Sequence, residues 1–588
     1  MFKGVIYLIK ICWRFDKVYV VALFSQQIIN AISSLMLIII PKFIIDELVG
    51  NKDAKLLTIY CVTLISLYFI SSVISNILSK LIFTHKISVF NEFQVYLSTL
   101  ISSADYEQLE DNNFLDLKEK AYKFLYANGS GFAQILDNTV AILGKFIFIL
   151  GLIGIIATFD LYMVALFIVL TIFSVFIDAK MKKKNIQIQL EKVLCERKGQ
   201  YFLNLFSDFS FGKEIRVNNL SNWLISKYKI QLNENEKFYK KMSKNNIHSA
   251  NFNSVTILVQ QLCVYAYLVY KALFNLISIG DFSMYIQTVN NFSATLKGII
   301  SDIVDVQQYR IYYEEFRKYI DIKNDLRKGT LKPDFSNGIY EIKFKNVSFR
   351  YKNQENYALK NVTLTISPNE KLAIVGENGA GKTTFVKLLS RLYDPTEGEI
   401  LLNGINIKDI DYDYYMNLFS VIYQDFKLFS FTIRDNICLD KSNDIDDLQY
   451  NKILKQSGIH KKIESLPYGS ETYIYKNFSK HSFEPSGGEG QKIALSRALI
   501  KDAPYIILDE PTAALDPRAE HEMYSHFSDL VKNKVAIYIS HRLSSTKFCD
   551  KIAVFKNGRL IEYGSHSELI IYNSYYNELF TMQAKYYK

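Results

Sequence analysis

The sequence predicts a membrane-embedded α-helical bundle fused to a C-terminal α/β phosphate-loop domain. Apolar runs of membrane-spanning length recur in the first half of the chain, whereas the second half alternates short β-branched runs with amphipathic helices. A glycine-rich phosphate-binding pattern lies in that second half. The 588 residues, 49% hydrophobic and 22% charged, fit two unlike halves better than one soluble enzyme.

Six apolar stretches are long enough to cross a bilayer as helices, which takes about 20 residues each. They cover residues 18–45, 56–78, 135–158, 161–177, 254–273 and 282–300. The loops after the second and fourth stretches are long and helical in pattern, so we expect these spans to extend well beyond the bilayer. The sixth stretch contains Gln287, Asn290, Asn291 and Lys297, which are costly against lipid and are expected to face a cavity.

Charge predicts the orientation of these spans. Residues 180–184 carry four lysines, and together with the basic N-terminus they place the long loops and both termini in the cytoplasm. The net charge of +10 is therefore assigned to cytoplasmic loops, and no nucleic acid partner is expected. Residues 2–17 form an amphipathic pattern that predicts a helix on the membrane surface, and Lys10 interrupts what would be the apolar core of a signal peptide.

Polar residues within the spans have two interpretations: they line a substrate cavity, or they only bridge neighbouring helices. The residues concerned are Gln26, Gln27, Asn30, Gln260, Gln261, Gln287 and Asn290. The six cysteines show no CxxC pair or metal-ligand spacing, so neither a disulfide framework nor a zinc site is predicted.

A cluster of Gly, Pro, Asn and Ser marks the domain boundary. We expect a membrane domain over residues 1–323, a linker over 324–339 and a nucleotide-binding domain over 340–588.

The phosphate loop follows a buried strand, KLAIVG, and precedes a helix. This context supports a match to GxxxxGK[ST], in which glycines let backbone N–H groups close around phosphate oxygens. Lys382 is expected to reach the outer phosphates of ATP, and the Thr383 hydroxyl to ligate Mg²⁺. The full set of loop residues predicted to bind nucleotide is Gly376, Asn378, Gly379, Ala380, Gly381, Lys382, Thr383 and Thr384.

A second apolar strand, residues 505–508, ends in two carboxylates. Asp509 matches the strand-borne acid that holds Mg²⁺ in nucleotide hydrolases. Glu510 is expected to polarise the attacking water as a general base. The alternative interpretation, a solvated turn, is disfavoured by the four apolar residues before the pair.

The segment EPSGGEGQK between these motifs resembles the signature motif of ABC transporters. Ser486, Gly487 and Gly488 are intact, whereas Pro485 and Glu489 replace the usual Leu and Gln of LSGGQ. The resemblance also implies roles for four single residues. Gln424 resembles the Q-loop residue, which binds the metal and takes part in catalysis. Asp516 resembles the D-loop acid, and His541 resembles the catalytic switch histidine. Tyr351 resembles the aromatic residue that stacks on adenine.

The helical half resembles exporter-type ABC proteins in layout. The family resemblance implies a dimer, because the signature of one chain would meet ATP held by the phosphate loop of the other. It also implies short transverse helices in the two long cytoplasmic loops, expected near residues 107–117 and 213–224. The partner is expected to be a second copy or a related half-transporter.

The resemblance implies an ATP-driven exporter in the plasma membrane of a bacterium, with its ATPase domain in the cytoplasm. EPSGGEGQK and EPTAALDP resemble the peptide-export branch, so a small peptide is the expected substrate. A lipid or multidrug exporter is an alternative, because a polar-lined cavity also suits an amphiphile. An ATP-gated channel or sensor is an alternative of another class, which intact Glu510 and His541 argue against.

Overall fold

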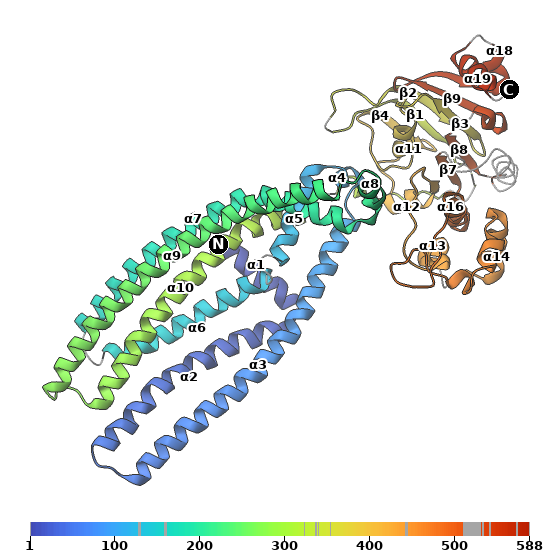
Figure 1. The fold of residues 1–588 in the computed structure, drawn as a ribbon. Helices are drawn as coiled ribbons and strands as arrows, with labels where there is room; N and C mark the ends of the chain where they lie inside the picture. Colours follow the sequence, from blue (N-terminus) through green and yellow to red (C-terminus); the bar gives the residue numbers. More distant parts are fainter. Residues whose placement is uncertain are drawn as a thin grey trace. The chain divides into compact units, whose positions relative to one another are not determined.

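The computed structural model describes residues 2–586 apart from 127–130, 158–160, 323, 335–337, 339, 353, 442–444, 510–530, 532–533, 540–542 and 572–573. The chain forms two compact units. The first comprises Met1–Ser102 and Asn112–Ile322, and the second comprises Ser103–Asp111 and Lys323–Lys588. The first unit is helical, and the second contains the β-sheets (Figure 1).

The first unit consists of long helices and a few short ones. They are α1 (Phe2–Phe15), α2 (Lys17–Val49), α3 (Ala54–Ser102), α5 (Asn112–Tyr126), α6 (Gly131–Ala157), α7 (Leu161–Ser207), η2 (Phe209–Phe211), α8 (Gly212–Val217), α9 (Ser221–Leu273) and α10 (Ile279–Ile320). The longest, α9, has 53 residues, or roughly 80 Å at 1.5 Å per residue, well over twice the hydrocarbon thickness of a bilayer. The predicted membrane bundle with long helical extensions is therefore confirmed.

Each predicted span lies in a different long helix. Among the described residues, α2, α3, α6 and α9 are long and apolar enough to cross a membrane. The other two predicted spans fall in α7 and α10. In α10 the Thr288 hydroxyl is satisfied within the helix, since it donates to the carbonyl of Met284 at 2.6 Å.

Asp16 fixes the junction between the amphipathic helix α1 and the first long helix. Its Oδ1 accepts hydrogen bonds from the backbone N–H groups of Val18 and Tyr19, at 2.9 and 3.2 Å. Its Oδ2 lies 2.6 Å from Nδ1 of His85 in α3. An N-cap carboxylate thus starts α2 and also joins it to a neighbouring helix.

The bundle helices pack lengthwise, α2 against α3, α6 against α2 and α10, and α7 against α9 (Figure 1). Two of the polar residues singled out in the spans join such neighbours. Gln26 donates to the Ser79 hydroxyl at 2.8 Å, and Gln260 donates to Ser293. Asn290, in contrast, is exposed in the single chain.

The second unit contains two sheets. Their strands are β1 (Ile342–Phe349), β2 (Leu359–Ile366), β3 (Lys371–Gly376), β4 (Glu397–Leu402), β5 (Ile405–Asn406), β6 (Phe419–Ile422), β7 (Tyr505–Asp509), β8 (Val535–Ile539), β9 (Lys551–Lys556) and β10 (Arg559–Gly564). Strands β2-β1-β4-β5 form an antiparallel sheet. The other sheet has the order β10-β9-β3-β8-β7-β6 and is parallel except for β10.

Helices complete the second unit. They are α4 (Tyr106–Leu109), η3 (Leu326–Lys328), α11 (Lys382–Leu389), α12 (Tyr412–Asn417), α13 (Ile433–Cys438), η4 (Leu439–Lys441), α14 (Asp447–Ser457), α15 (His460–Glu464), η5 (Gly469–Glu471), α16 (Gly487–Lys501), η6 (Leu543–Phe548), α18 (His566–Ile571) and α19 (Tyr575–Tyr586). The short helices α4 and α8 lie at the two places where transverse helices were expected.

Helix α11 packs between the two sheets. Phe385 stacks on Phe344 of β1 with ring centroids 4.6 Å apart, and it lies 5.5 Å from the ring of Phe555 in β9. Its side chain is fully buried. The helix that follows the phosphate loop is therefore fixed from both sides by aromatic packing. Helices α13 to α16 have a separate apolar core that includes Ile437 and Ile493.

Candidate functional site

The phosphate loop connects β3 to α11 through backbone conformations that suit glycine. Gly376, Gly379 and Gly381 have φ angles of +154°, +80° and +104°. A Cβ atom on Gly376 would lie 2.3 Å from the carbonyl oxygen of Phe555. The strand-loop-helix expected from the sequence is present, and these glycines shape it.

Lys382 occupies the first position of α11 and points back into the loop. Its Nζ donates to the carbonyl oxygens of Gly376 at 2.8 Å and Glu377 at 3.0 Å, and the residue is 6% exposed. Thr383, the next residue, is exposed, whereas Thr384 is buried. The loop thus holds an ammonium group beside backbone N–H groups, an arrangement that suits phosphate.

Asp509 and Gln424 lie at the same edge of the parallel sheet as the loop. Asp509 ends β7 and is 5% exposed. It pairs with Ile539 of β8, and Ile539 also pairs with Ile374 of β3. Asp509 is therefore level with the end of β3, two strand spacings or roughly 10 Å away. Gln424 follows β6 by two residues and is exposed.

Tyr351 connects the end of β1 to the phosphate-loop helix. Its hydroxyl lies 3.1 Å from the Thr384 hydroxyl. Its ring packs edge-on against Phe349 and Tyr393, with centroids 4.9 and 5.5 Å away. The aromatic residue expected to stack on adenine therefore lies beside the phosphate-binding helix.

The signature segment begins α16. Ser486 is its N-cap, and Ser486 and Gly487 are exposed there. Glu489, the unusual residue of this motif, accepts a hydrogen bond from the Ser486 backbone N–H at 2.9 Å and pairs with Lys462 at 3.2 Å. Burial acts to raise the pKa of Glu489, but the hydrogen bonds to Ser486 and Lys462 outweigh it and lower this pKa. A glutamate here completes a capping box, as the usual glutamine also would, and its charge adds the ion pair with Lys462.

Three predicted site residues, Glu510, Asp516 and His541, lie outside the described residues. Asp509, directly before Glu510, and Ile539, two residues before His541, end adjacent strands.

Sequence reasoning missed one side chain at the phosphate loop. The Tyr575 hydroxyl donates to Oε1 of Glu377 at 2.5 Å, and the hydrogen bond raises the pKa of Tyr575 to about 12. Lys556 lies 3.9 Å from the centre of the Tyr575 ring. Tyr575 is separated from Glu377 by 198 residues, so no local pattern marks the pair.

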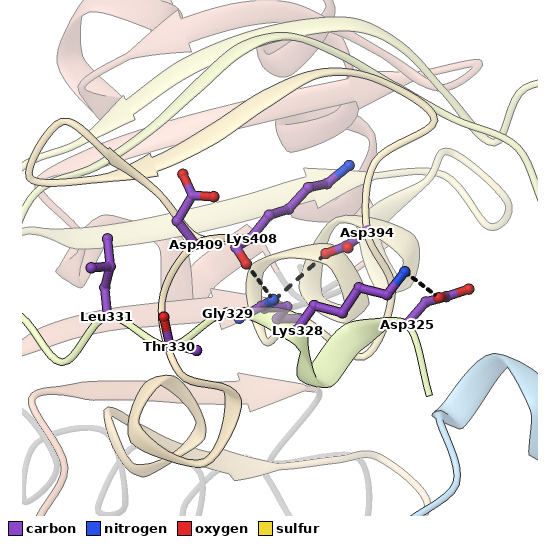
Figure 2. Close-up of a pocket in the computed structure, with 9 residues that line it drawn as sticks. Asp325, Lys328, Gly329, Thr330, Leu331, Asp394, Lys408 and Asp409 are labelled. Carbon is purple, nitrogen blue, oxygen red and sulfur yellow. Dashed lines mark hydrogen bonds and ion pairs between the residues drawn. The ribbon is translucent and has the colours of Figure 1, made fainter. Parts of the chain in front are cut away.

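A cavity of about 600 Å³ lies where the linker crosses the ATPase unit. Figure 2 shows the side chains of Lys328, Asp325 and Asp394 along it. Arg391, 1% exposed, also lines it and donates to the carbonyl oxygens of Ile410, Leu326 and Lys408 at 2.8, 3.0 and 3.2 Å. One guanidinium thus joins the linker to the 408–410 loop.

Replacing this guanidinium should loosen the linker. Arg391→Lys keeps the charge but lacks the planar fork that reaches three carbonyl groups. We expect the free energy of unfolding to fall by about 2–4 kcal/mol, because buried acceptors lose their donors. Trypsin should then cleave faster after Arg327 and Lys328, measured by mass spectrometry of timed digests. The control is Arg350→Lys, at an exposed side chain over Tyr357; equal cleavage of both variants would contradict the assignment.

Comparison with known proteins finds similarity to transport ATP-binding proteins. A family model described as ABC transporter matches residues 359–513. The subtilin transport ATP-binding protein of Bacillus subtilis is 28% identical over 95% of this chain and 91% of its own length. The nisin transport ATP-binding protein of Lactococcus lactis is 29% identical over 97% of this chain and 95% of its own length. The ATP-dependent lipid A-core flippase of Haemophilus ducreyi is 33% identical over 52% of this chain and 51% of its own length.

A solved structure shares the fold of the whole chain. It is described as a bacterial Atm1-family ABC exporter with ATP bound, and it superposes with a TM-score of 0.83 at 20% identity. The match covers 96% of this chain and 99% of the other. The helical half and the ATPase half therefore occur together in the same order in a known architecture.

Proposed function

Because this chain belongs to the ABC transporter superfamily and has an exporter fold, we propose that it moves a small peptide out of the cytoplasm as a dimer of two identical chains. It is a multi-pass membrane protein that couples ATP hydrolysis to transport. The bacterial relatives support placing it in the cell membrane with the ATPase unit in the cytoplasm. The observation that carries the peptide assignment is similarity over nearly the full length to two peptide transport proteins.

ATP binding is assigned to the edge of the parallel sheet. Lys382 exchanges the two carbonyl oxygens that it contacts for phosphate oxygens, which are stronger acceptors for an ammonium group. The backbone N–H groups of the loop and the first turn of α11 bind the remaining phosphate oxygens, from Gly376 to Thr384. Tyr351 stacks on the adenine ring. The proximity of its hydroxyl to Thr384 supports this division between base and phosphate.

Mg²⁺ is assigned to oxygen ligands at the same edge. The exposed Thr383 hydroxyl, the Asp509 carboxylate and the Gln424 amide oxygen are donors that this ion prefers. Among the described residues, no three His, Cys, Asp or Glu side chains are grouped to hold a metal. That finding fits an ion whose remaining ligands are phosphate and water. When bound, Mg²⁺ neutralises charge on the phosphate oxygens.

Hydrolysis is assigned to Glu510 and His541. Glu510 follows Asp509 at the end of β7, where it accepts a proton from the attacking water. His541 follows β8 by two residues and contacts the transferred phosphate. Gln424 orients the water and joins the nucleotide to the loop after β6.

A second chain completes each nucleotide site. Ser486, Gly487 and Gly488 begin α16, whose helix dipole and free N–H groups suit a phosphate. In one chain this end belongs to the lobe with the α13–α16 core, apart from the core that packs around α11. Two ATP molecules held between two chains, with Asp516 at the contact, draw the ATPase units together and reorient the helices.

Relatives named for lipid or multidrug export resemble only part of this chain. The lipid A-core flippase match and a multidrug export protein of Bacillus subtilis cover 52% and 41% of it. The peptide transport proteins cover more than nine-tenths, so their similarity extends through the helices that contact substrate. This contrast favours a peptide over a lipid.

Transport by vesicles tests the assignment. Protein reconstituted in inside-out liposomes should accumulate a peptide such as subtilin or nisin only with ATP and Mg²⁺. Peptide should also stimulate ATP hydrolysis severalfold. This factor corresponds to about 1 kcal/mol of differential binding to the active conformation. The control is a matched preparation of the Glu510→Gln variant. Stimulation by lipid A or by a hydrophobic dye, with none by subtilin or nisin, would contradict the substrate class.

A further inference from the structure

The segment Ser103–Asp111 belongs to the second unit, although helices of the first unit precede and follow it. Asp105 holds the start of this segment. Its Oδ2 accepts hydrogen bonds from the backbone N–H groups of Asp325 at 2.6 Å and Leu326 at 3.3 Å. Asn324 donates to the carbonyl of Ser103 at 2.6 Å. The segment is therefore held by hydrogen bonds to residues 324–326 of the second unit. Along the chain it is joined directly to α3 and α5.

Glu110 holds the other end of the segment on the phosphate-loop helix. Its Oε1 lies 3.0 Å from Nζ of Lys387 in α11, and its Oε2 accepts a hydrogen bond from Tyr393. Burial acts to raise the pKa of Glu110, but the hydrogen bonds from Tyr393 and Lys387 outweigh it and lower this pKa. The carboxylate thus stays charged and joined to α11.

Lys387 lies among three tyrosine rings. Its Nζ is 5.2, 5.7 and 5.5 Å from the ring centres of Tyr106, Tyr351 and Tyr393. Its side chain is 19% exposed. Burial acts to lower the pKa of Lys387, but the hydrogen bond to Glu110 and the surrounding tyrosines outweigh it and raise this pKa. The ammonium therefore depends on Glu110 and on the ring faces for its stability.

Tyr351 connects this cage to the nucleotide. The same residue is assigned above to adenine stacking, and it also contacts Thr384 of the phosphate loop. From Tyr351 the contacts run through Lys387 to Glu110 without a gap. We propose that Lys387 and Glu110 are positioning residues that tie adenine binding at Tyr351 to the placement of the 103–111 segment. This inference rests on the nucleotide site proposed above.

Adenine stacking restrains Tyr351, and the restrained ring stabilises Lys387 in one position over its face. Lys387 in turn fixes Glu110. An exposed ion pair alone contributes little to stability, but here the ammonium is largely withdrawn from water, and among the described residues its ion pair is with Glu110. Removing that partner should leave nucleotide binding in place and release the segment.

Hydrogen–deuterium exchange of the full-length protein in nanodiscs tests the connection. The ligands are Mg²⁺ with a non-hydrolysable ATP analogue, or Mg²⁺ with tripolyphosphate, which has no adenine. In the wild type we expect the ATP analogue to slow amide exchange in 103–111 by about tenfold, and tripolyphosphate to slow it by about twofold or less. Both ligands should slow exchange in the phosphate loop.

Glu110→Gln and Lys387→Gln should each reduce the effect of the ATP analogue on 103–111 to about twofold, with unchanged protection of the phosphate loop. The reversed pair, Glu110→Lys with Lys387→Glu, should restore part of it. The matched control is Glu107→Gln, an exposed glutamate three residues earlier that makes no ion pair with any described residue.

Three results overturn the proposal and are distinguishable. Full protection of 103–111 in both single variants, with a protected phosphate loop, removes Glu110 and Lys387 from this role alone. Absence of protection in the phosphate loop of the wild type removes the nucleotide site itself. Loss of segment protection in Glu107→Gln to the same extent would also overturn it, because the effect would then not depend on the Lys387 partner.

Discussion

Glu510→Gln should stop ATP turnover while leaving ATP bound. The amide cannot accept a proton from the attacking water, so we expect kcat to fall by about 10²–10⁴-fold. Phosphate contacts from Lys382 and the loop are unaffected, so the affinity for ATP should stay within about twofold of the wild type. Phosphate release and equilibrium binding of a fluorescent ATP analogue measure the two quantities on the same reconstituted sample.

Glu464→Gln provides the matched control for this substitution. Glu464 lies on α15 with its side chain 64% exposed and pairs with His460. Its replacement should leave kcat unchanged. If Glu510→Gln hydrolyses ATP at the rate of this control, another group is the general base.

Two inactive chains should restore hydrolysis when they are combined. Lys382→Ala removes the buried ammonium of the phosphate loop, and Gly488→Asp places a negative charge at the start of α16, where phosphate is expected. Each variant alone should lose about 10²–10³-fold in kcat, the range found when one preorganised charge-stabilising donor is removed. The two variants are co-expressed and co-purified through two different tags. Each mixed dimer then has one intact site, made of the phosphate loop of the Gly488→Asp chain and the signature of the Lys382→Ala chain.

Activity of the tagged mixture, compared with each variant alone, decides whether the sites are shared. We expect the mixed dimers to recover about half of the wild-type kcat, because one of two sites is complete. The doubly substituted chain mixed with either single variant controls for incidental rescue. Mixed dimers as inactive as their parents would show that loop and signature act within one chain.

The local chemistry of the phosphate loop follows from contiguous residues. A buried strand, three glycines with left-handed backbone and a lysine at a helix start all lie within Lys371–Leu389, so sequence spacing alone predicts their geometry. The apolar runs predict membrane helices for the same reason, since a span is defined by its own composition. The strand order that brings Asp509 level with β3 does not follow from contiguous residues, because it is set by the pairing of both β3 and β7 with β8.

Polar residues in the spans show the limit of such reasoning. Composition marks Gln26 and Gln260 as costly against lipid, but it does not distinguish a cavity from a helix contact. The structure gives each a serine partner on a neighbouring helix. Ser79 and Ser293 were unremarkable in the sequence.

The sequence by itself determined the helical and α/β halves of this protein, its membrane-spanning helices and the position of the nucleotide motifs, because each depends on periodicity or on backbone preferences over a few residues. Only the tertiary structure decided that Glu110 meets Lys387, 277 residues away, and that Arg391 holds the carbonyl of Leu326. Such contacts depend on how separate elements pack, and a side chain's partner across that distance is chosen by the fold as a whole.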